Sequence, residues 1–429
     1  MSKPERIVIT GMAINTPLGD TLGGFLDGLL AGKSALSNWK TIDVSRCYSK
    51  VGADLSTYDI AAKLAKLEGA VPPEIWRKAR KLISKSPWTT KLTILLALDA
   101  YVDAKLAGAF DGDRVAAIVA GHNINLNHQY ENRLQYAEEP DFMDSLLALT
   151  GLDTDHAGVI SEVLGVCGPI YTVGAACASG NTALRCAIDE VRYHDIDCAI
   201  VVGAVLDFSP VELHAMALMG AITFTSFNDE PTRACRPYDT RREGFVPAHG
   251  GGAIVIETLT SAKRRGATIY AEILGVEAGS DANHLPQPSE DGQAKVMTKL
   301  LKQCGVAPSQ VDYISAHATS TPLGDLTEIR SIKRVFGEHA KALKINAPKS
   351  MLGHTCWAAP TVETVAAVLQ MRAGMLHPSI NIDELDPEVD LDVCRGTAPV
   401  PWNVKIMMKN SFGFGGINCV SLIARWEEP

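Results

Sequence analysis

Short, nearly continuous apolar runs alternate along the chain with helix-length segments. The runs predict strands at residues 6–14, 114–121, 171–175, 197–205, 251–257, 267–281, 311–317, 343–349, 407–415 and 418–426. Between them, residues 91–108 and 178–194 predict helices. Strands that are apolar on both faces are typical of a sheet covered on both sides, so the pattern predicts an α/β fold.

Two similar series of strands and helices follow one another, which predicts a layered α/β fold built from two duplicated halves. We place the halves at residues 1–257 and 258–429. Residues 34–90 and 122–154 are less regular, and we expect them to be insertions. Long insertions in α/β folds often carry binding or dimer surfaces.

The composition is that of a globular protein with a large core: of 429 residues, 46% are hydrophobic and 21% are charged. The net charge of -9 argues against a nucleic-acid partner. An acidic protein partner would need a local basic patch, such as one that includes Arg77, Arg80 or Lys81. No apolar run approaches the roughly 18 residues that span a bilayer, and no secretory signal pattern is present, so we expect a cytoplasmic protein without a membrane partner.

Metal-ligand patterns are weak. The ten cysteines are scattered without CxxC pairs or zinc spacing, and most should be small hydrophobic core residues. His122 and His128 lie among Asn and Tyr residues in the segment 122–136, at a spacing that fits no standard ligand set. We interpret this segment as a polar loop and expect no metal.

One cysteine lies where a thiol could react. In the stretch YTVGAACASGNTAL, residues 171–184, a strand stops near Gly174 and a helix begins near Ala178, with Cys177 between them. Unpaired N–H groups and the positive end of a helix favour a thiolate at that position. The small neighbouring residues would allow a sharp turn and a close substrate. A packing role for Cys177 remains the alternative at this point.

Two further segments, each with a histidine, favour a nucleophilic role for Cys177 over a packing role. His317 follows an apolar strand in ISAHATSTPLGD, and Lys349 and His354 follow another in NAPKSMLGHT. A third segment, NSFGFGGIN at 410–418, is a Gly-rich turn with two aromatic residues. In open α/β sheets, sites collect at the carboxyl ends of strands, so these segments are expected to meet.

The ordered set of motifs resembles the β-ketoacyl synthases, the condensing enzymes of fatty-acid and polyketide synthesis. The resemblance runs nearly end to end and rests on VITGMAINTPLG, GAACASGN, CRPYDTRREGFVPAHGGGAIVIE, AHATSTPLGD, KSMLGH and NSFGFGGIN. It implies a thiolase-like fold with α-β-α-β-α layers. It also implies an acyltransferase that decarboxylates a malonyl-carrier protein and joins the enolate to an acyl group.

By this resemblance, Cys177 matches the family nucleophile, and His317 and His354 match its two active-site histidines. Neutral histidines could each present an N–H to the thioester oxygen of the enolate. Lys349 matches the family lysine, and Glu328 matches the acid that pairs with it. The last two would hold the histidine loops in place.

The Gly-rich turn, 413–416, supplies a further part of the implied site. Phe414 matches the residue whose backbone N–H joins that of Cys177 in an oxyanion hole, where one donor is typically worth roughly 3 to 4 kcal/mol. Thr319 and Thr321 resemble the threonines that bind the pantetheine arm. The resemblance implies substrate contacts for two residues of the Gly-rich segment as well, Phe412 and Gly415.

Three features depart from the elongation synthases. His249 stands where the family has an acidic residue, and we expect it to be structural. TCWAAP follows the second histidine in place of a run of small residues, so Trp357 and Pro360 would reshape the start of that helix. Three apolar residues fall where an acyl pocket could be, although core packing is the simpler role for methionines: Met216, Met219 and Phe224.

With these departures, the sequence resembles a smaller group, the stand-alone decarboxylases of polyketide β-branching cassettes. Those enzymes convert malonyl-carrier to acetyl-carrier. That group commonly has serine at the nucleophile, whereas this chain has Cys177. A non-catalytic partner subunit like a chain-length factor would usually have lost the nucleophile or a histidine. A coenzyme A-dependent thiolase would need a second cysteine in the Gly-rich turn, and Cys419 lies just beyond it.

The resemblance implies no metal or organic cofactor, because the phosphopantetheine arm belongs to the carrier-protein substrate. It also implies a homodimer. The family pairs through the strand near the nucleophile, so PIYTVGA at 169–175 is the expected interface strand.

Overall fold

Ten strands form one mixed sheet in the computed structural model, which describes residues 5–428. Its spatial order is β10-β9-β13-β14-β8-β1-β7-β6-β4-β5. The strands of the first half are β1 Ile7–Asn15, β4 Val115–Ala120, β5 Ile170–Val173, β6 Cys198–Gly203 and β7 Gly251–Thr258. Those of the second half are β8 Ala271–Ser280, β9 Tyr313–Ser315, β10 Lys344–Asn346, β13 Ile406–Gly413 and β14 Ile417–Arg425. Two small pairs stand apart: β2 Ser37–Asn38 with β3 Val51–Gly52, and β11 Met375–Leu376 with β12 Val400–Pro401.

The two halves repeat one topology. Read from the outer edge inward, the first half runs β5-β4-β6-β7-β1 and the second runs β10-β9-β13-β14-β8. In each half the first three of these strands are parallel and the last two are antiparallel to their neighbours. The halves join where β1 pairs with β8. The predicted duplication is therefore confirmed.

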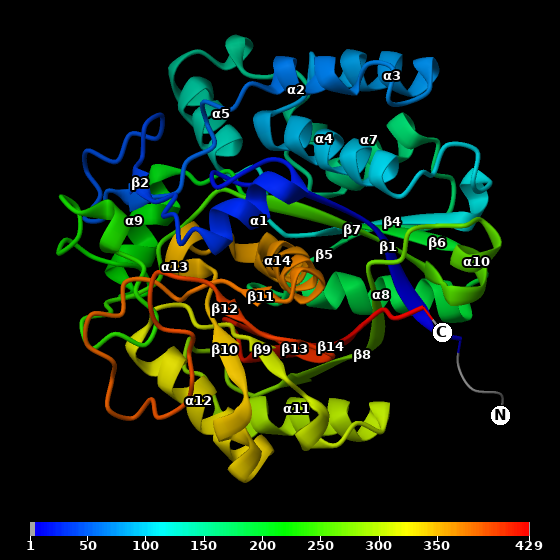
Figure 1. The fold of residues 1–429 in the computed structure, drawn as a ribbon. Coiled ribbons are helices and arrows are strands. Elements are labelled where there is room, and N and C mark those ends of the chain that lie inside the picture. Colours follow the sequence, from blue (N-terminus) through cyan, green and yellow to red (C-terminus); the bar gives the residue numbers. More distant parts are fainter. Residues whose placement is uncertain (1–4, 429) are drawn as a thin grey trace.

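Helices cover both faces of each half, so that five layers follow one another (Figure 1). An outer layer holds α4 Trp88–Asp103 and α7 Thr154–Leu164, the central layer holds α8 Ser179–Tyr193 and α14 Ala359–Ala373, and the opposite outer layer holds α11 Glu290–Cys304 and α12 Pro322–Phe336. The two central helices lie between the two halves of the sheet, where α14 is buried over most of its length and α8 leaves one side partly exposed. The expected α-β-α-β-α arrangement is confirmed.

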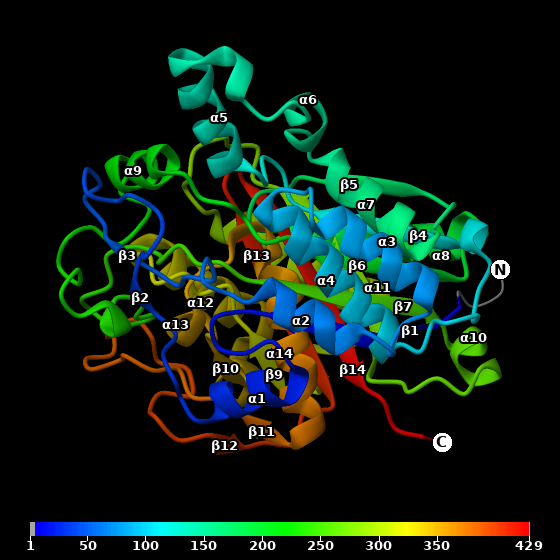
Figure 2. The same cartoon turned by 90° about the horizontal axis from the view of Figure 1, so that it is seen from above.

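The less regular regions of the sequence carry additional helices. Residues 34–90 include α2 Ile60–Leu67 and α3 Pro73–Ile83, and residues 122–154 include α5 Leu126–Glu138 and α6 Leu147–Thr150. Figure 2 shows α5 and α6 standing away from the main body. The remaining helices are α1 Leu22–Leu30, α9 Pro210–Leu218, α10 Leu259–Arg264 and α13 Lys349–Leu352. Among the described residues, none of the helices has the length and apolar character needed to cross a bilayer.

Strands β9 and β10 are shorter than the apolar runs that predicted them. The chain leaves the sheet after Ser315 and after Asn346, because side chains replace the next strand as acceptors. The N–H of His317 donates to Glu328, and the N–H of Ala347 donates to Ser379. These early exits create the loops in which the expected site residues lie.

Candidate active site

Cys177 lies in a tight turn between β5 and α8. Ala176, just before it, has a left-handed backbone with φ of 47°, which is strained for alanine. The Ser179 hydroxyl holds the turn, accepting from the Ala175 N–H at 2.8 Å and donating to the Ala176 carbonyl at 2.7 Å. A Cβ at Gly413 would lie 3.1 Å from the Cys177 nitrogen, so the end of β13 approaches this turn closely. The small residues of the motif therefore permit both the turn and this approach.

The pKa of the Cys177 thiol lies above its usual value. Burial raises its pKa to about 11, although the charge of Lys349 and the backbone N–H groups of Phe414 and Cys177 lower it. The expectation of a thiolate at a helix end is therefore wrong, because loss of solvation outweighs the favourable groups. The backbone N–H groups of Cys177 and Phe414 therefore both lie near the sulfur.

Two histidines complete a compact group with the thiol. Ligand atoms of Cys177, His317 and His354 lie within 4.8 Å of one another. The His354 Nδ1 accepts the Cys356 N–H at 3.2 Å, so the neutral ring carries its hydrogen on Nε2. That Nε2 is buried and has no hydrogen-bond partner within residues 5–428. Burial and the positive charge of Lys349 hold the pKa of both histidines well below the usual value.

Lys349 is the centre of a buried ionic network. Its Nζ donates to the His317 carbonyl at 2.6 Å and pairs with Glu363 on α14. Glu363 also pairs with Lys409 of β13 at 2.7 Å. The two lysines and the carboxylate are almost completely buried. The network fixes the loop of His317 to the central helix, and the charge of Lys349 adds to burial in lowering the pKa of both histidines.

Glu328 has a different partner from the one expected. The resemblance implies that Glu328 pairs with Lys349. In the structure, the carboxylate that pairs with Lys349 is that of Glu363. The Glu328 carboxylate accepts the backbone N–H groups of His317 and Ala318 at 2.9 and 2.8 Å, and the Asn410 side-chain amide at 2.9 Å. These three donors satisfy a buried carboxylate, so Glu328 positions the histidine loop directly rather than through the lysine.

Three residues of this site were not identified from the sequence. Glu363 on α14 and Lys409 on β13 are both buried, and each buried charge requires a partner, but the sequence does not show which residue that partner is. Phe245 lies with its ring edge-on to His354, at a centroid distance of 5.1 Å. No signal beyond the quoted motif indicated its place.

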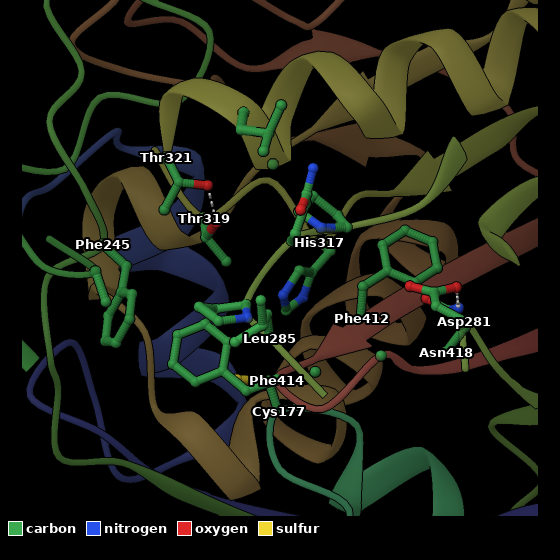
Figure 3. Close-up of a pocket in the computed structure, with 18 of the residues that line it drawn as sticks. Cys177, Phe245, Asp281, Leu285, His317, Thr319, Thr321, Phe412, Phe414 and Asn418 are labelled. Carbon is green, nitrogen blue, oxygen red and sulfur yellow. Dashed lines mark hydrogen bonds between the residues drawn. The ribbon is translucent and has the colours of Figure 1, made fainter. Parts of the chain in front are cut away.

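A cavity of about 270 Å³ leads from the thiol to the surface. Figure 3 shows Cys177 and Phe414 at one end, His317 above them, and Thr319 and Thr321 farther along. The cavity is also lined by Phe412, whereas Gly416 rather than Gly415 contributes from the Gly-rich turn. The geometry thus brings together the expected nucleophile, histidines and threonines, but not Gly415.

The threonine loop is held from outside the cavity. The hydroxyls of Thr319 and Thr321 are 3.0 Å apart and face the cavity. Between them, the Ser320 hydroxyl accepts the Arg236 N–H at 2.9 Å, and the Ser320 N–H donates to Asp325 at 3.0 Å. The motif CRPYD therefore anchors the loop after β9 and leaves two hydroxyls free to contact a substrate arm.

The cysteine and histidines also match the ligand types of a zinc ion. However, the charges of Lys349 and Lys409 that lower the pKa of His317 would also repel a dication at this point. The neutral N–H donors are better suited to a developing oxyanion than to a metal. The expectation of no metal stays a prediction.

Two of the three departures noted in the sequence can be placed relative to the cavity. His249 is buried beside Trp39 and Trp88, accepts the Leu55 N–H at 3.1 Å, and lies outside the active-site cavity. Of the three apolar residues expected near an acyl pocket, Met219 lines the cavity, whereas Met216 and Phe224 do not.

Cys419 does not contribute to the cavity. It is fully buried on β14 in a small core cluster with Ala175 and Ala178. The second reactive cysteine that a thiolase mechanism needs is therefore not supplied by this residue.

Two family models match the chain. The N-terminal domain of beta-ketoacyl synthase matches residues 4–262, and the C-terminal domain matches residues 270–383. The 3-oxoacyl-(acyl-carrier-protein) synthase 2 of Staphylococcus aureus (strain COL) is 33% identical over 432 residues, covering 100% of both chains. The polyketide biosynthesis malonyl-ACP decarboxylase PksF of Bacillus subtilis (strain 168) is 31% identical over 425 residues, covering 99% of this chain and 97% of that protein.

Solved structures show the same likeness. The AntDE:AntF complex, a type II PKS acyl-carrier protein with its ketosynthase, matches with a TM-score of 0.86 and 26% identity, covering 99% of this chain and 100% of that chain. The ishigamide ketosynthase/chain length factor matches with a TM-score of 0.87 and 28% identity over the same shares.

Proposed function

Because the chain belongs to the β-ketoacyl synthase family, we propose that it catalyses a decarboxylative condensation between an acyl group on Cys177 and malonyl-carrier protein. The observation that carries this proposal is a cluster of chemical groups at one place in the cavity. A thiol, two backbone N–H donors and two neutral histidines converge at the inner end of the cavity.

The first step transfers an acyl group to Cys177. The sulfur attacks the acyl thioester, the N–H groups of Cys177 and Phe414 stabilise the tetrahedral oxyanion, and the pantetheine sulfur departs with the proton of the thiol. Charge that develops in a water-excluded site is stabilised most by donors already in place. Both N–H groups lie near the sulfur, and so near the position that the oxyanion would take.

The second step removes carbon dioxide from the malonyl group. The thioester oxygen gains negative charge as the carboxylate leaves, and the N–H of His354 Nε2 donates to it together with His317. The resulting enolate attacks the acyl carbonyl on Cys177. A β-ketoacyl-carrier forms, and the released thiolate of Cys177 takes a proton from solvent. Thr319 and Thr321 would hold the pantetheine arm during both steps.

A second candidate is decarboxylation alone, in which the enolate takes a proton and gives acetyl-carrier. It is favoured by the similarity to the decarboxylase PksF over nearly the full chain. This reaction needs the histidines and not the thiol. A non-catalytic subunit is a poorer candidate, because Cys177, His317, Lys349 and His354 are all present and assembled.

The carrier protein is the expected partner, and we further propose a homodimer. Strand β5 is one of the two edge strands of the sheet, and one of its sides has no partner strand among residues 5–428. The neighbouring insertion exposes several large apolar side chains, namely Phe142, Leu146, Leu149 and Leu152. Light scattering in solution would test this state. The cytoplasmic location and the absence of a cofactor stay predictions.

Intact-protein mass spectrometry of a malonyl-loaded carrier would separate the two activities. The reaction is run with and without an acyl donor, beside Cys177→Ala. A β-ketoacyl product that requires the donor and is lost in Cys177→Ala supports condensation. Acetyl-carrier formed without a donor, at a rate that survives Cys177→Ala, supports the decarboxylase and overturns condensation as the main reaction.

A further inference from the structure

Asn181 joins the helix that follows the nucleophile to the hairpin that carries the Gly-rich turn. It lies in the first turn of α8, shortly after Cys177, and its side chain is buried. Its amide nitrogen donates to the Ser411 hydroxyl at 3.2 Å, to the Cys419 carbonyl at 3.2 Å and to the Lys409 carbonyl at 3.4 Å. Ser411 and Cys419 face each other across β13 and β14, so a single amide reaches both strands of the hairpin.

The neighbours of this amide fix its orientation. Two of the three groups around the nitrogen are carbonyls, which can only accept, so the N–H groups and not the oxygen must face the hairpin. The Asn181 oxygen is buried and has no hydrogen-bond partner among residues 5–428. A buried polar atom without a partner is costly, so an amide that only filled this space would be a poorer choice than a leucine. The bonds of the nitrogen are therefore what the side chain contributes.

The same two elements carry the N–H groups of the proposed oxyanion hole. The Cys177 N–H lies directly before α8, and the Phe414 N–H lies in the turn between β13 and β14. Helix start and hairpin approach each other closely here, since a Cβ on Gly413 would lie 3.1 Å from the Cys177 nitrogen. The distance between the two N–H groups thus depends on how the start of α8 rests on the hairpin.

A small apolar cluster adjoins this attachment. Ala175, Ala178 and Cys419 are buried together, with Ile417 packed against them. Apolar packing is non-directional, whereas hydrogen bonds to both strands set the position and the rotation of the helix start. The amide of Asn181 therefore supplies a directional restraint that the cluster does not.

The hairpin is held at the same place by the buried ionic network. The Lys409 ammonium donates to the Ser411 hydroxyl at 3.3 Å and pairs with Glu363 of α14 at 2.7 Å. Asn181 thus bonds to a strand that is already fixed to the central helix α14. Loss of the amide should free the start of α8 and leave the strand and the histidine loops in place.

We propose that Asn181 is a positioning residue for the oxyanion hole: its amide holds the start of α8 on the hairpin, so that the N–H groups of Cys177 and Phe414 bind one oxygen. This inference rests on the proposed acylation of Cys177. Acyl transfer uses this pair of donors, whereas decarboxylation uses the two histidines. A displacement of about 1 Å in a positioned group can slow a reaction by about 10²-fold.

The test compares two reactions of one protein. Transfer of acetyl from its coenzyme A thioester to Cys177 is followed by intact mass after rapid quenching, and decarboxylation is followed as carbon dioxide released from malonyl-carrier. Asn181→Leu keeps the approximate size of the side chain without its N–H groups. The control is Asn125→Leu, which removes another buried amide, one that bonds to Thr89 and Thr150 outside the cavity.

Asn181→Leu should slow acetyl transfer at saturating donor by about 10- to 100-fold. The donor concentration at half saturation and the decarboxylation rate should change by no more than about threefold, because Asn181 contacts neither the threonine loop nor the histidines. Asn125→Leu should leave the ratio of acetyl transfer to decarboxylation unchanged. Ser411→Ala removes one of the three acceptors and should lower this ratio by about threefold.

An unchanged ratio in Asn181→Leu, whether both rates fall together or neither falls, would overturn the inference and leave the proposed condensation intact. If Asn181→Leu is unfolded at the assay temperature, an unchanged ratio in Ser411→Ala would overturn it in the same way. No acetyl transfer in the wild-type protein, with malonyl-carrier still decarboxylated, would overturn both the inference and the condensation.

Discussion

His122 and His317 occupy the same place in the two halves of the molecule. Each is the second residue after the second strand of its half, β4 or β9. The residue between the strand and the histidine makes the same hydrogen bond in both, since Gly121 donates to Val173 at the end of β5 and Ala316 donates to Asn346 at the end of β10. The duplication therefore places a histidine near the same end of each half.

The surroundings of the two histidines differ. His317 is beside Lys349 and Lys409, which lower its pKa together with burial, and its ring is 5.5 Å from that of His354. His122 stacks on Trp357, and burial lowers its pKa although the charge of Asp153 acts in the opposite direction. Equal topology thus gives one residue suited to an oxyanion and one suited to packing. The loops, and not the sheet, decide the chemistry.

Replacing each histidine by alanine should give the largest difference in decarboxylation rate between the two positions. We expect His317→Ala to slow decarboxylation of malonyl-carrier by about 10²–10³-fold, because an oxyanion donor is lost. His122→Ala should slow the same step by no more than about threefold, because His122 contacts Trp357 rather than the thioester. Carbon dioxide release at saturating substrate measures both. Equal losses in the two variants would remove the distinction between the halves.

The thiol should titrate as a buried group. Because burial raises the pKa of Cys177 to about 11, its reaction with iodoacetamide should accelerate by about tenfold per pH unit between roughly pH 8 and 10. Peptide mapping identifies the modified cysteine at each pH. A plateau of the Cys177 rate near neutral pH would mean that the thiolate is stable in the free protein.

Lys349 should set the acid limit of the reaction. Its charge lowers the pKa of His317 and His354, so Lys349→Met should raise both values toward the usual range. The neutral histidines would then be lost at a higher pH, and the decarboxylation rate near pH 6 should fall by about tenfold relative to its own maximum. The control is Lys344→Met, because Lys344 on β10 forms a partly exposed ion pair with Asp392. An unshifted acid limb in Lys349→Met would contradict this role.

Loss of a hydroxyl from the pair Thr319 and Thr321 should have the smallest effect on catalysis among these changes. Thr319→Val removes one hydroxyl from the cavity and should raise the KM for malonyl-carrier by about threefold to tenfold with little change in kcat. Thr90→Val, buried on α4 away from the cavity, controls for the loss of a hydroxyl from the core. A fall in kcat without a change in KM would place Thr319 at the reacting atoms instead.

Most of the fold could be predicted from the sequence because the buried strands are continuous apolar runs. The duplication was visible in the order of these runs, and the motifs placed Cys177, His317 and His354 at neighbouring loops. The boundary at residue 257 stays a prediction.

Three features of the site could not be obtained from the sequence. The partner of Lys349 depends on which carboxylate the folded chain brings near it. That carboxylate belongs to Glu363 on α14, the helix between the two halves of the sheet. The pKa of Cys177 depends on burial, which the small residues around it do not reveal. The stack of Trp357 on His122 joins residues of both halves and requires three-dimensional packing.

The most direct measurement asks which cysteine becomes acylated. The protein is incubated with acetyl thioester of coenzyme A, digested, and mapped by peptide mass spectrometry. We expect acetyl on Cys177, which is buried at the inner end of the cavity, and not on Cys167, which is exposed. Acetyl on Cys167 with Cys177 unmodified, in a protein that makes β-ketoacyl product, would contradict it.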